Sequence, residues 1–306
     1  MKRFLYLVLI LLSVQTYAQT YAIPDNVKRI LFLGNSITYN GKYISFIDAY
    51  LTLKYLQRNF EIINLGLPSE TVSGLSEPNH AGGKFPRPVL QERLERALTN
   101  IKPDLVFACY GINDGIYMPF DDERFQKFKD GIKQLHDQVL LSGAPIVHIT
   151  PPVYDPRKGA AYANVLDLYS DWLISSRYSM KWDVLDVHGP MKKFLEDRRM
   201  VDTAFLFAKD GIHPNDIGHF VMAKAILLDL GNQELSKATD IPSALSGFKN
   251  GDAVFKLVEE RQAIMKDAWL TLNGHKRPGM KAGLPLKDAI LSRDAINLKI
   301  QSLLKE

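Results

Sequence analysis

Five short apolar runs alternate with longer helix-like stretches along the first three quarters of the chain, and this alternation limits the possible folds most strongly. The runs lie at residues 30–33, 61–65, 104–110, 145–150 and 182–187. Near-continuous apolar runs of this length are typical of strands that are buried on both faces of a parallel sheet. The pattern therefore predicts βα repeats, an α/β fold class and a parallel sheet between layers of helices.

The expected helices of this α/β unit lie at 43–58, 89–100, 122–141, 160–178, 190–199 and 215–230. Two long loops, 69–88 and 151–159, are rich in glycine and proline, and loops of this length in an α/β domain often form the walls of a site. Two further helix-like stretches, 253–272 and 286–304, follow Gly231. We predict an α/β domain at 19–235 and a C-terminal helical extension at 236–306, a hairpin that lies on the main domain or contacts a partner.

The bend of this predicted hairpin carries a small basic patch of His275, Lys276 and Arg277. Charged residues that gather in a loop usually face water. The patch is therefore interpreted as a solvated turn.

The first residues have the layout of a cleavable secretory signal. Lys2 and Arg3 precede an apolar run at 4–12, and small or polar residues follow up to Ala18. The run is too short to span a bilayer, and no second apolar stretch of spanning length follows. We expect a signal peptide at 1–18, no membrane span in the mature protein, and an exported protein, periplasmic or secreted.

Composition narrows the classes of function. With 46% apolar and 24% charged residues the chain is an ordinary globular protein, and no basic stripe with interleaved aromatic residues indicates nucleic-acid binding. Cys109 is the only cysteine and lies in an apolar run, so it predicts a buried side chain and excludes an internal disulfide. The histidines lack metal-ligand spacing, and we expect neither a metal nor a cofactor.

Ser36 directly follows the first apolar run, in the stretch RILFLGNSITYNG. Ligands of open α/β sheets bind at the carboxyl ends of the strands, so a serine there is either a nucleophile or a helix cap. A serine nucleophile needs a base and a group that orients the base. Asp210 and His213 lie three residues apart in the loop KDGIHPN, where the carboxylate can hold the imidazole in the tautomer that a general base needs.

Two further turns after strand-like runs carry candidate donors for an oxyanion. Gly66 follows the second run, where a backbone N–H can approach a ligand closely, and Asn113 follows the third run with an amide NH₂. Together with the N–H of Ser36, these groups predict an oxyanion hole of three donors.

Four blocks in the same order resemble those of the SGNH hydrolases, also called the GDSL esterase and lipase family. The blocks are Gly34-Asn35-Ser36, Gly66, Gly111-Ile112-Asn113-Asp114 and Asp210-Gly211-Ile212-His213. The resemblance implies a flavodoxin-like three-layer fold, Ser36 as nucleophile, His213 as base, Asp210 as its partner, and an oxyanion hole of Ser36, Gly66 and Asn113. Asn35 departs from the pattern, because the family's name-giving block has aspartate there.

The expected activity is hydrolysis of a small-molecule or oligosaccharide ester through an acyl-enzyme. We favour a short acyl group, acetyl, on a carbohydrate, since export would bring the protein to polysaccharides and tyrosines near the blocks could contact a sugar. These are Tyr39, Tyr43, Tyr110 and Tyr117. An acyltransferase, a lysophospholipase or an arylesterase would use the same residues. A non-catalytic carbohydrate-binding or assembly module is the alternative of another class, and the oligomeric state stays open.

Overall fold

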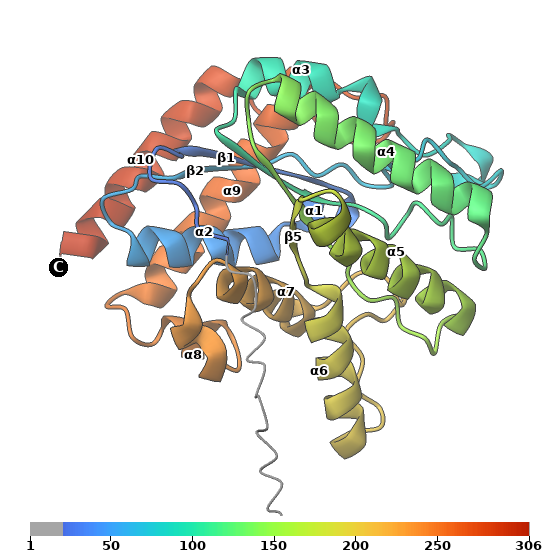
Figure 1. Cartoon of the computed structure of the whole chain (residues 1–306). Coiled ribbons are helices and arrows are strands. Elements are labelled where there is room, and N and C mark those ends of the chain that lie inside the picture. The colour runs from blue at the N-terminus through green and yellow to red at the C-terminus, as the bar shows by residue number, and fades with distance from the viewer. Residues whose placement is uncertain (1–20, 306) are drawn as a thin grey trace, which may run out of the picture.

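Five parallel strands form the centre of the molecule, in the order β2-β1-β3-β4-β5 (Figure 1). The structure is a computed structural model that describes residues 21–305, so the signal peptide predicted at 1–18 lies outside the described residues. All five strands were predicted from their apolar runs, and each lies within one or two residues of its expected ends. Their bounds are Arg29–Gly34 for β1, Glu61–Asn64 for β2, Leu105–Cys109 for β3, Ile146–Ile149 for β4 and Asp183–Leu185 for β5.

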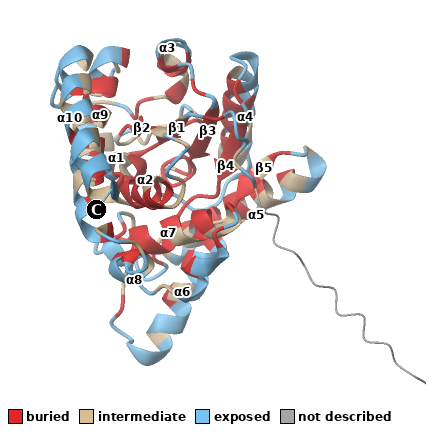
Figure 2. Ribbon diagram, turned by 90° about the vertical axis from the view of Figure 1, so that its left-hand side faces the viewer, coloured by how far each residue is buried: buried red, intermediate tan, exposed pale blue. Residues whose placement is uncertain are grey.

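Helices cover both faces of this sheet. In Figure 1, α3, α4 and α5 lie on one face, and α2 and α7 lie on the other. The burial pattern follows these layers, since the strands, α2 and α7 are mostly buried (Figure 2). The α/β prediction with a parallel sheet between helices is therefore confirmed. The helices run as α1 Ser36–Asn40, α2 Lys42–Lys54, α3 Leu94–Ile101, α4 Asp122–Leu141, α5 Ala160–Ser179, α6 His188–Val201, α7 Asp216–Asp229, α8 Ile241–Leu245, α9 Gly251–Asn273 and α10 Leu286–Lys305.

Several helices differ from the sequence-based expectation. The helix predicted at 89–100 begins only at Leu94, and the short α8 was not predicted. The helix predicted at 43–58 ends at Lys54, and the chain turns before Asn59, which has a left-handed backbone with φ of 45°. The five-residue α1, which begins at Ser36, was not predicted as a helix. A segment this short has too few residues to show helical periodicity, and helices of this length depend on tertiary contacts.

The C-terminal helices form a hairpin that lies on the main domain. Helix α9 packs against α2 and β2, and α10 packs on the outer side of α9. Arg261 of α9 donates two hydrogen bonds of 2.8 Å to the buried carboxylate of Asp48 in α2, and Gln262 donates to Asp48 and to the backbone oxygen of Ile62. Because a buried carboxylate is stable only with partners, these contacts hold α9 to the sheet. No helix within residues 21–305 is long and apolar enough to cross a membrane.

Candidate active site

Ser36, His213 and Asp210 form a continuous chain of hydrogen bonds at the carboxyl end of β1. The Ser36 Oγ lies 2.8 Å from His213 Nε2, and His213 Nδ1 lies 2.6 Å from Asp210 Oδ2. The sequence separates Ser36 from His213 by 177 positions, and the fold brings them together. The side chains of His213 and Asp210 are 51% and 50% exposed, so this chain of groups is open to solvent and to large substrates.

Ser36 is the first residue of α1, and the residue that caps this helix is its neighbour. The side chain of Asn35 accepts a hydrogen bond from the Ile37 N–H at 3.2 Å. The capping role that a serine at this place could have is thus filled by Asn35, and the Ser36 hydroxyl is left to His213. The N–H of Ser36 has no acceptor within the helix, because the first N–H groups of any helix lack one.

The loop that carries Asp210 and His213 is held in shape by its own hydrogen bonds. Asp210 Oδ1 accepts from the N–H groups of Ile212 and His213, both at 2.9 Å. Although burial acts to raise the pKa of the Asp210 carboxyl, its hydrogen bonds with His213 and Ile212 hold that pKa below the ordinary value. Asn215 then caps α7 by accepting from the Gly218 N–H at 3.0 Å, which fixes the far end of the loop.

A second loop supports this one from the side. The N–H of Asp155 donates to the Gly211 oxygen at 3.0 Å, and the nearly buried Asp155 side chain pairs with Arg199 at 2.6 Å. This pair lies in the loop predicted at 151–159 and in α6. The loop therefore braces the segment that carries His213.

Asn113 is buried in the turn after β3, and its amide is oriented by two partners. Its Nδ2 donates to the Glu70 backbone oxygen at 3.0 Å, and its Oδ1 accepts from the Tyr117 hydroxyl at 2.9 Å. The second amide hydrogen has no acceptor among residues 21–305. Ile116 and Tyr117 both have positive φ, of 48° and 56°, which non-glycine residues rarely adopt. This strained turn places the Tyr117 hydroxyl on Asn113, a role that no sequence pattern indicated.

Gly66 lies where the sequence placed it, but its N–H already has a partner. The N–H donates to Asn64 Oδ1 at 2.9 Å. A Cβ atom added at Gly66 would lie 2.3 Å from the backbone nitrogen of Tyr39. Only glycine fits at this contact between the end of β2 and α1, and that close packing accounts for the residue. Of the three predicted donors, the N–H of Ser36 and one amide hydrogen of Asn113 are the ones without an acceptor in the described residues.

Two buried carboxylates, those of Asp114 and Glu70, hold the segments around Asn113 in place through hydrogen bonds. The sequence analysis assigned neither residue this role. Asp114 Oδ1 accepts from the N–H groups of Val72 and Ser73, and Oδ2 accepts from the Gly111 N–H, all at 2.9 Å. Asp114 therefore ties the loop at 69–88 to the turn that carries Asn113.

The second of these carboxylates, Glu70, forms a bidentate ion pair with Arg93, at 2.6 and 2.7 Å, and both side chains are almost fully buried. The Tyr110 hydroxyl also donates to Glu70, at 2.7 Å. Pairings between segments this far apart leave no signal in a single sequence.

The four tyrosines expected near a sugar divide into two groups. The expectation is wrong for Tyr43 and Tyr110, which are 0% and 1% exposed and whose hydroxyls bond to Thr38 and Glu70. Tyr39 and Tyr117 are partly buried at the rim of the site. A further aromatic residue, Tyr154, packs against Tyr117 with ring centroids 6.2 Å apart and lies beside Gly211 of the His213 loop.

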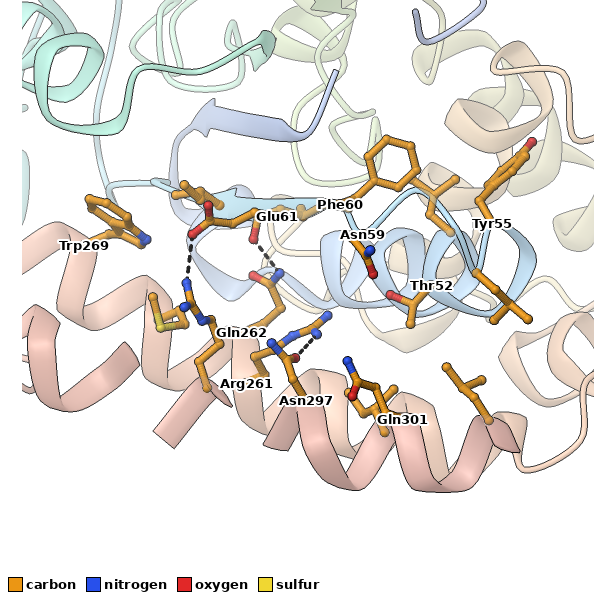
Figure 3. A pocket seen from close by; sticks show the side chains of 18 residues that line it. Thr52, Tyr55, Asn59, Phe60, Glu61, Arg261, Gln262, Trp269, Asn297 and Gln301 are labelled. Atoms are coloured by element: carbon orange, nitrogen blue, oxygen red, sulfur yellow. Dashed lines mark hydrogen bonds and ion pairs between the residues drawn. The ribbon is translucent and has the colours of Figure 1, made fainter. Parts of the chain in front are cut away.

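The Cys109 thiol and the pocket between α2, β2, α9 and α10 offer no alternative active site. Burial raises the pKa of the Cys109 thiol to about 12, in line with its predicted buried position. Figure 3 shows a pocket of about 320 Å³ between α2, β2, α9 and α10. Glu61, the first residue of β2, lines it, so it lies toward the amino ends of the strands and includes none of the predicted site residues. Within residues 21–305, no three His, Cys, Asp or Glu residues are grouped as metal ligands would be.

Two comparisons with known proteins, one with family models and one with single proteins, both find acylhydrolases or esterases. Residues 32–220 match the GDSL-like lipase/acylhydrolase family. An acetylxylan esterase from Geobacillus stearothermophilus is 21% identical over an alignment of 226 residues, and the match covers 67% of this chain and 94% of that protein. The family match ends at residue 220, before the C-terminal hairpin of α9 and α10.

Solved structures share the same fold at low sequence identity. The structure of that acetylxylan esterase superposes with a TM-score of 0.53 at 20% identity, covering 67% of this chain and 94% of that chain. An alpha/beta hydrolase from the metagenome of Lake Arreo, Spain, gives 0.54 at 21% identity, with 70% and 98% covered. A gut microbial diltiazem-metabolizing enzyme gives 0.57 at 22% identity, where the match covers 70% of this chain and 49% of that chain.

Proposed function

The chain belongs to the GDSL-like lipase/acylhydrolase family, and from this we propose that it is a serine esterase in which Ser36 is the nucleophile. His213 is the general base, and Asp210 orients it. The observation that carries the proposal is the hydrogen-bonded series Asp210–His213–Ser36, with distances of 2.6 and 2.8 Å, at the carboxyl end of β1. A serine that only begins a helix would need neither the His213 imidazole nor the Asp210 carboxylate that is bonded to this imidazole.

The reaction proceeds in two steps that use the same groups. The Ser36 Oγ attacks the ester carbonyl carbon while its proton passes to His213 Nε2. The tetrahedral intermediate collapses, the C–O bond to the alcohol breaks, and the alcohol leaves with the proton from His213. Water then attacks the acyl-enzyme with His213 again as base. The bond between the acyl carbon and Ser36 Oγ breaks, Oγ takes the proton back from His213, and the acid is released. The reaction needs no cofactor.

The negative charge of the intermediate is stabilised by donors that the free protein holds ready. We assign the principal donors to the N–H of Ser36 and the amide of Asn113, because neither donor hydrogen has an acceptor in the described residues. The Gly66 N–H is engaged by Asn64 in the free protein. Gly66 therefore contributes mainly through its close contact with α1. Its N–H is the third donor of the predicted oxyanion hole, shared between Asn64 and the oxyanion.

The proposed substrate is a short acyl ester, acetyl, on a carbohydrate. The similarity to an acetylxylan esterase over 94% of that protein supports this choice. The half-exposed His213 and Asp210 also suit a substrate that extends beyond the reacting ester.

An acyl-chain series with purified protein tests both parts of the proposal. We expect hydrolysis of aryl acetate, with kcat/KM falling as the acyl chain lengthens, and release of acetate from acetylated xylo-oligosaccharides. Ser36→Ala should remove both activities. Failure of the wild-type protein to cleave any aryl ester would favour a non-catalytic binding module, and transfer of the acetyl group to an added alcohol with little free acetate would favour an acyltransferase.

A further inference from the structure

The bend of the C-terminal hairpin, residues 274–285, reaches the end of the sheet at which Ser36 lies. Both ends of the bend are fixed. The backbone oxygen of Asn273 accepts from Arg96 Nε of α3 at 2.9 Å, and the Asn273 side chain accepts from Asn100 at 3.0 Å. At the other end, the Gly283 N–H donates to Thr271 Oγ1 at 2.7 Å. In the free protein the bend is thus held by contacts with α3 and with α9.

The hairpin touches the helix that carries Ser36. Lys266 Nζ of α9 donates to the Tyr39 backbone oxygen at 3.1 Å and lies 3.8 Å from the centroid of the Tyr39 ring. The Tyr39 hydroxyl donates to Asp267 at 3.4 Å. Tyr39 lies one turn after Ser36 on α1, and its backbone nitrogen contacts Gly66. The end of α9 is therefore one helical turn away from the proposed nucleophile.

Arg277, in the bend, lies beside this contact and faces the loop at 69–88. Its guanidinium carbon is 5.5 Å from the centroid of the Phe85 ring. Two residues further on, Arg87 lies over the Tyr117 ring at 5.2 Å, and Tyr117 is the residue that orients Asn113. Arg277 and Phe85 thus lie on the same side of the site as Asn113, one of the proposed oxyanion donors.

The charge of Arg277 has no counterion in the described part of the chain. Its Nε is buried without an acceptor, its Nη1 donates to the Pro278 backbone oxygen at 3.1 Å, and Arg277 takes part in no ion pair among residues 21–305. Arg87 and Arg93, by contrast, are paired with Glu77 and Glu70. A half-buried guanidinium without a carboxylate is a site that favours an anion, because its planar donors match the two oxygens of a carboxylate.

We propose that Arg277 and Phe85 form a subsite for an acidic sugar, with the guanidinium binding the carboxylate of a uronic acid and the aromatic ring contacting the sugar ring. The inference rests on the proposed esterase function and deepens it, since it assigns the preferred ester to a carbohydrate chain that carries uronic acids. It also gives the C-terminal extension a role in choosing the substrate.

The test compares acetylated xylo-oligosaccharides of equal length with and without a glucuronic acid substituent, and uses aryl acetate as a neutral reference. The wild-type protein should prefer the acidic substrate, and the preference should fall at high salt. Arg277→Gln should lower kcat/KM for the acidic substrate by about tenfold, mainly through KM, as expected for the loss of one charge-assisted contact of about 1.4 kcal/mol. Its activity on aryl acetate should stay within about twofold. Lys281→Gln, which removes one charge from an exposed position of the same bend, is the control and should keep the preference.

Equal loss on acidic, neutral and aryl substrates in Arg277→Gln would show a structural role and overturn the inference. No preference in the wild-type protein would overturn it as well. Calorimetric binding of the acidic oligosaccharide to Ser36→Ala and to Ser36→Ala/Arg277→Gln separates the two proposals. Binding that depends on Arg277, together with a wild-type protein that cleaves no ester, would support the subsite and contradict the esterase.

Discussion

Replacing Asp114 by asparagine should destabilise the protein strongly, although the two side chains have nearly the same shape. Asp114 is 0% exposed, and its two oxygens accept three backbone N–H groups at 2.9 Å. Asparagine can keep its oxygen toward Val72 and Ser73, but its NH₂ then faces the Gly111 N–H. A buried donor without an acceptor costs about 1–3 kcal/mol, and this substitution creates two. With the loss of charge in the two remaining bonds, the sum is about 3–6 kcal/mol.

Asp121→Asn is the matched control for this prediction. Asp121 caps α4 through one oxygen, which accepts from the Arg124 N–H at 2.8 Å, and asparagine caps helices about as well as aspartate. Urea unfolding followed by circular dichroism should show a change of about 0.5 kcal/mol or less for Asp121→Asn. A loss below about 1 kcal/mol for Asp114→Asn would contradict the reasoning, since the three bonds would then not be made by an ionised carboxylate.

Three further outcomes follow from the geometry. Asn113→Ala should lower kcat on aryl acetate by about two to three powers of ten, and a loss of less than tenfold would remove Asn113 from the oxyanion hole. Gly66→Ala should lower kcat about a hundredfold, because the added Cβ would displace α1 through Tyr39, while Gly247→Ala, with nothing within 4 Å, should change neither kcat nor the melting temperature. Burial beside His136 lowers the pKa of His148 to about 3, so the unfolded chain takes up this proton more readily. The contribution of His148 to the free energy of unfolding should therefore fall by about 2–3 kcal/mol between pH 7 and pH 4.5, and His148→Phe should weaken the pH dependence by about that amount, as urea unfolding at the two pH values can show.

The layout of the fold could be predicted because its strands are buried on both faces. Runs such as 104–110 are apolar at almost every position, and only a covered parallel sheet accounts for them. The strand order could not be predicted from such runs, since neighbouring strands are chosen by contacts between distant segments. That order places the ends of β1, β2 and β3 side by side, and so brings Ser36, Gly66 and Asn113 to one place.

The site could be predicted only where local motifs carry it. Ser36 directly follows an apolar run, and Asp210 and His213 lie together in a short polar loop. The structure brings these three together, while their catalytic roles stay predictions. The direction of a side chain was harder to predict, because Tyr110 follows a strand as Ser36 does and yet turns inward to Glu70. The roles of Asp114, Arg277 and Tyr154 depend on contacts across the fold, for which a single sequence gives no signal.

Covalent labelling of the nucleophile tests the central claim most directly. After treatment with an organophosphonate, intact-mass and peptide analysis should find one adduct per chain, on the peptide that contains Ser36. Ser36→Ala should take up no label, and His213→Ala should react far more slowly, because the base that removes the Ser36 proton is missing. An adduct on another serine, or equally fast labelling of His213→Ala, would contradict the account.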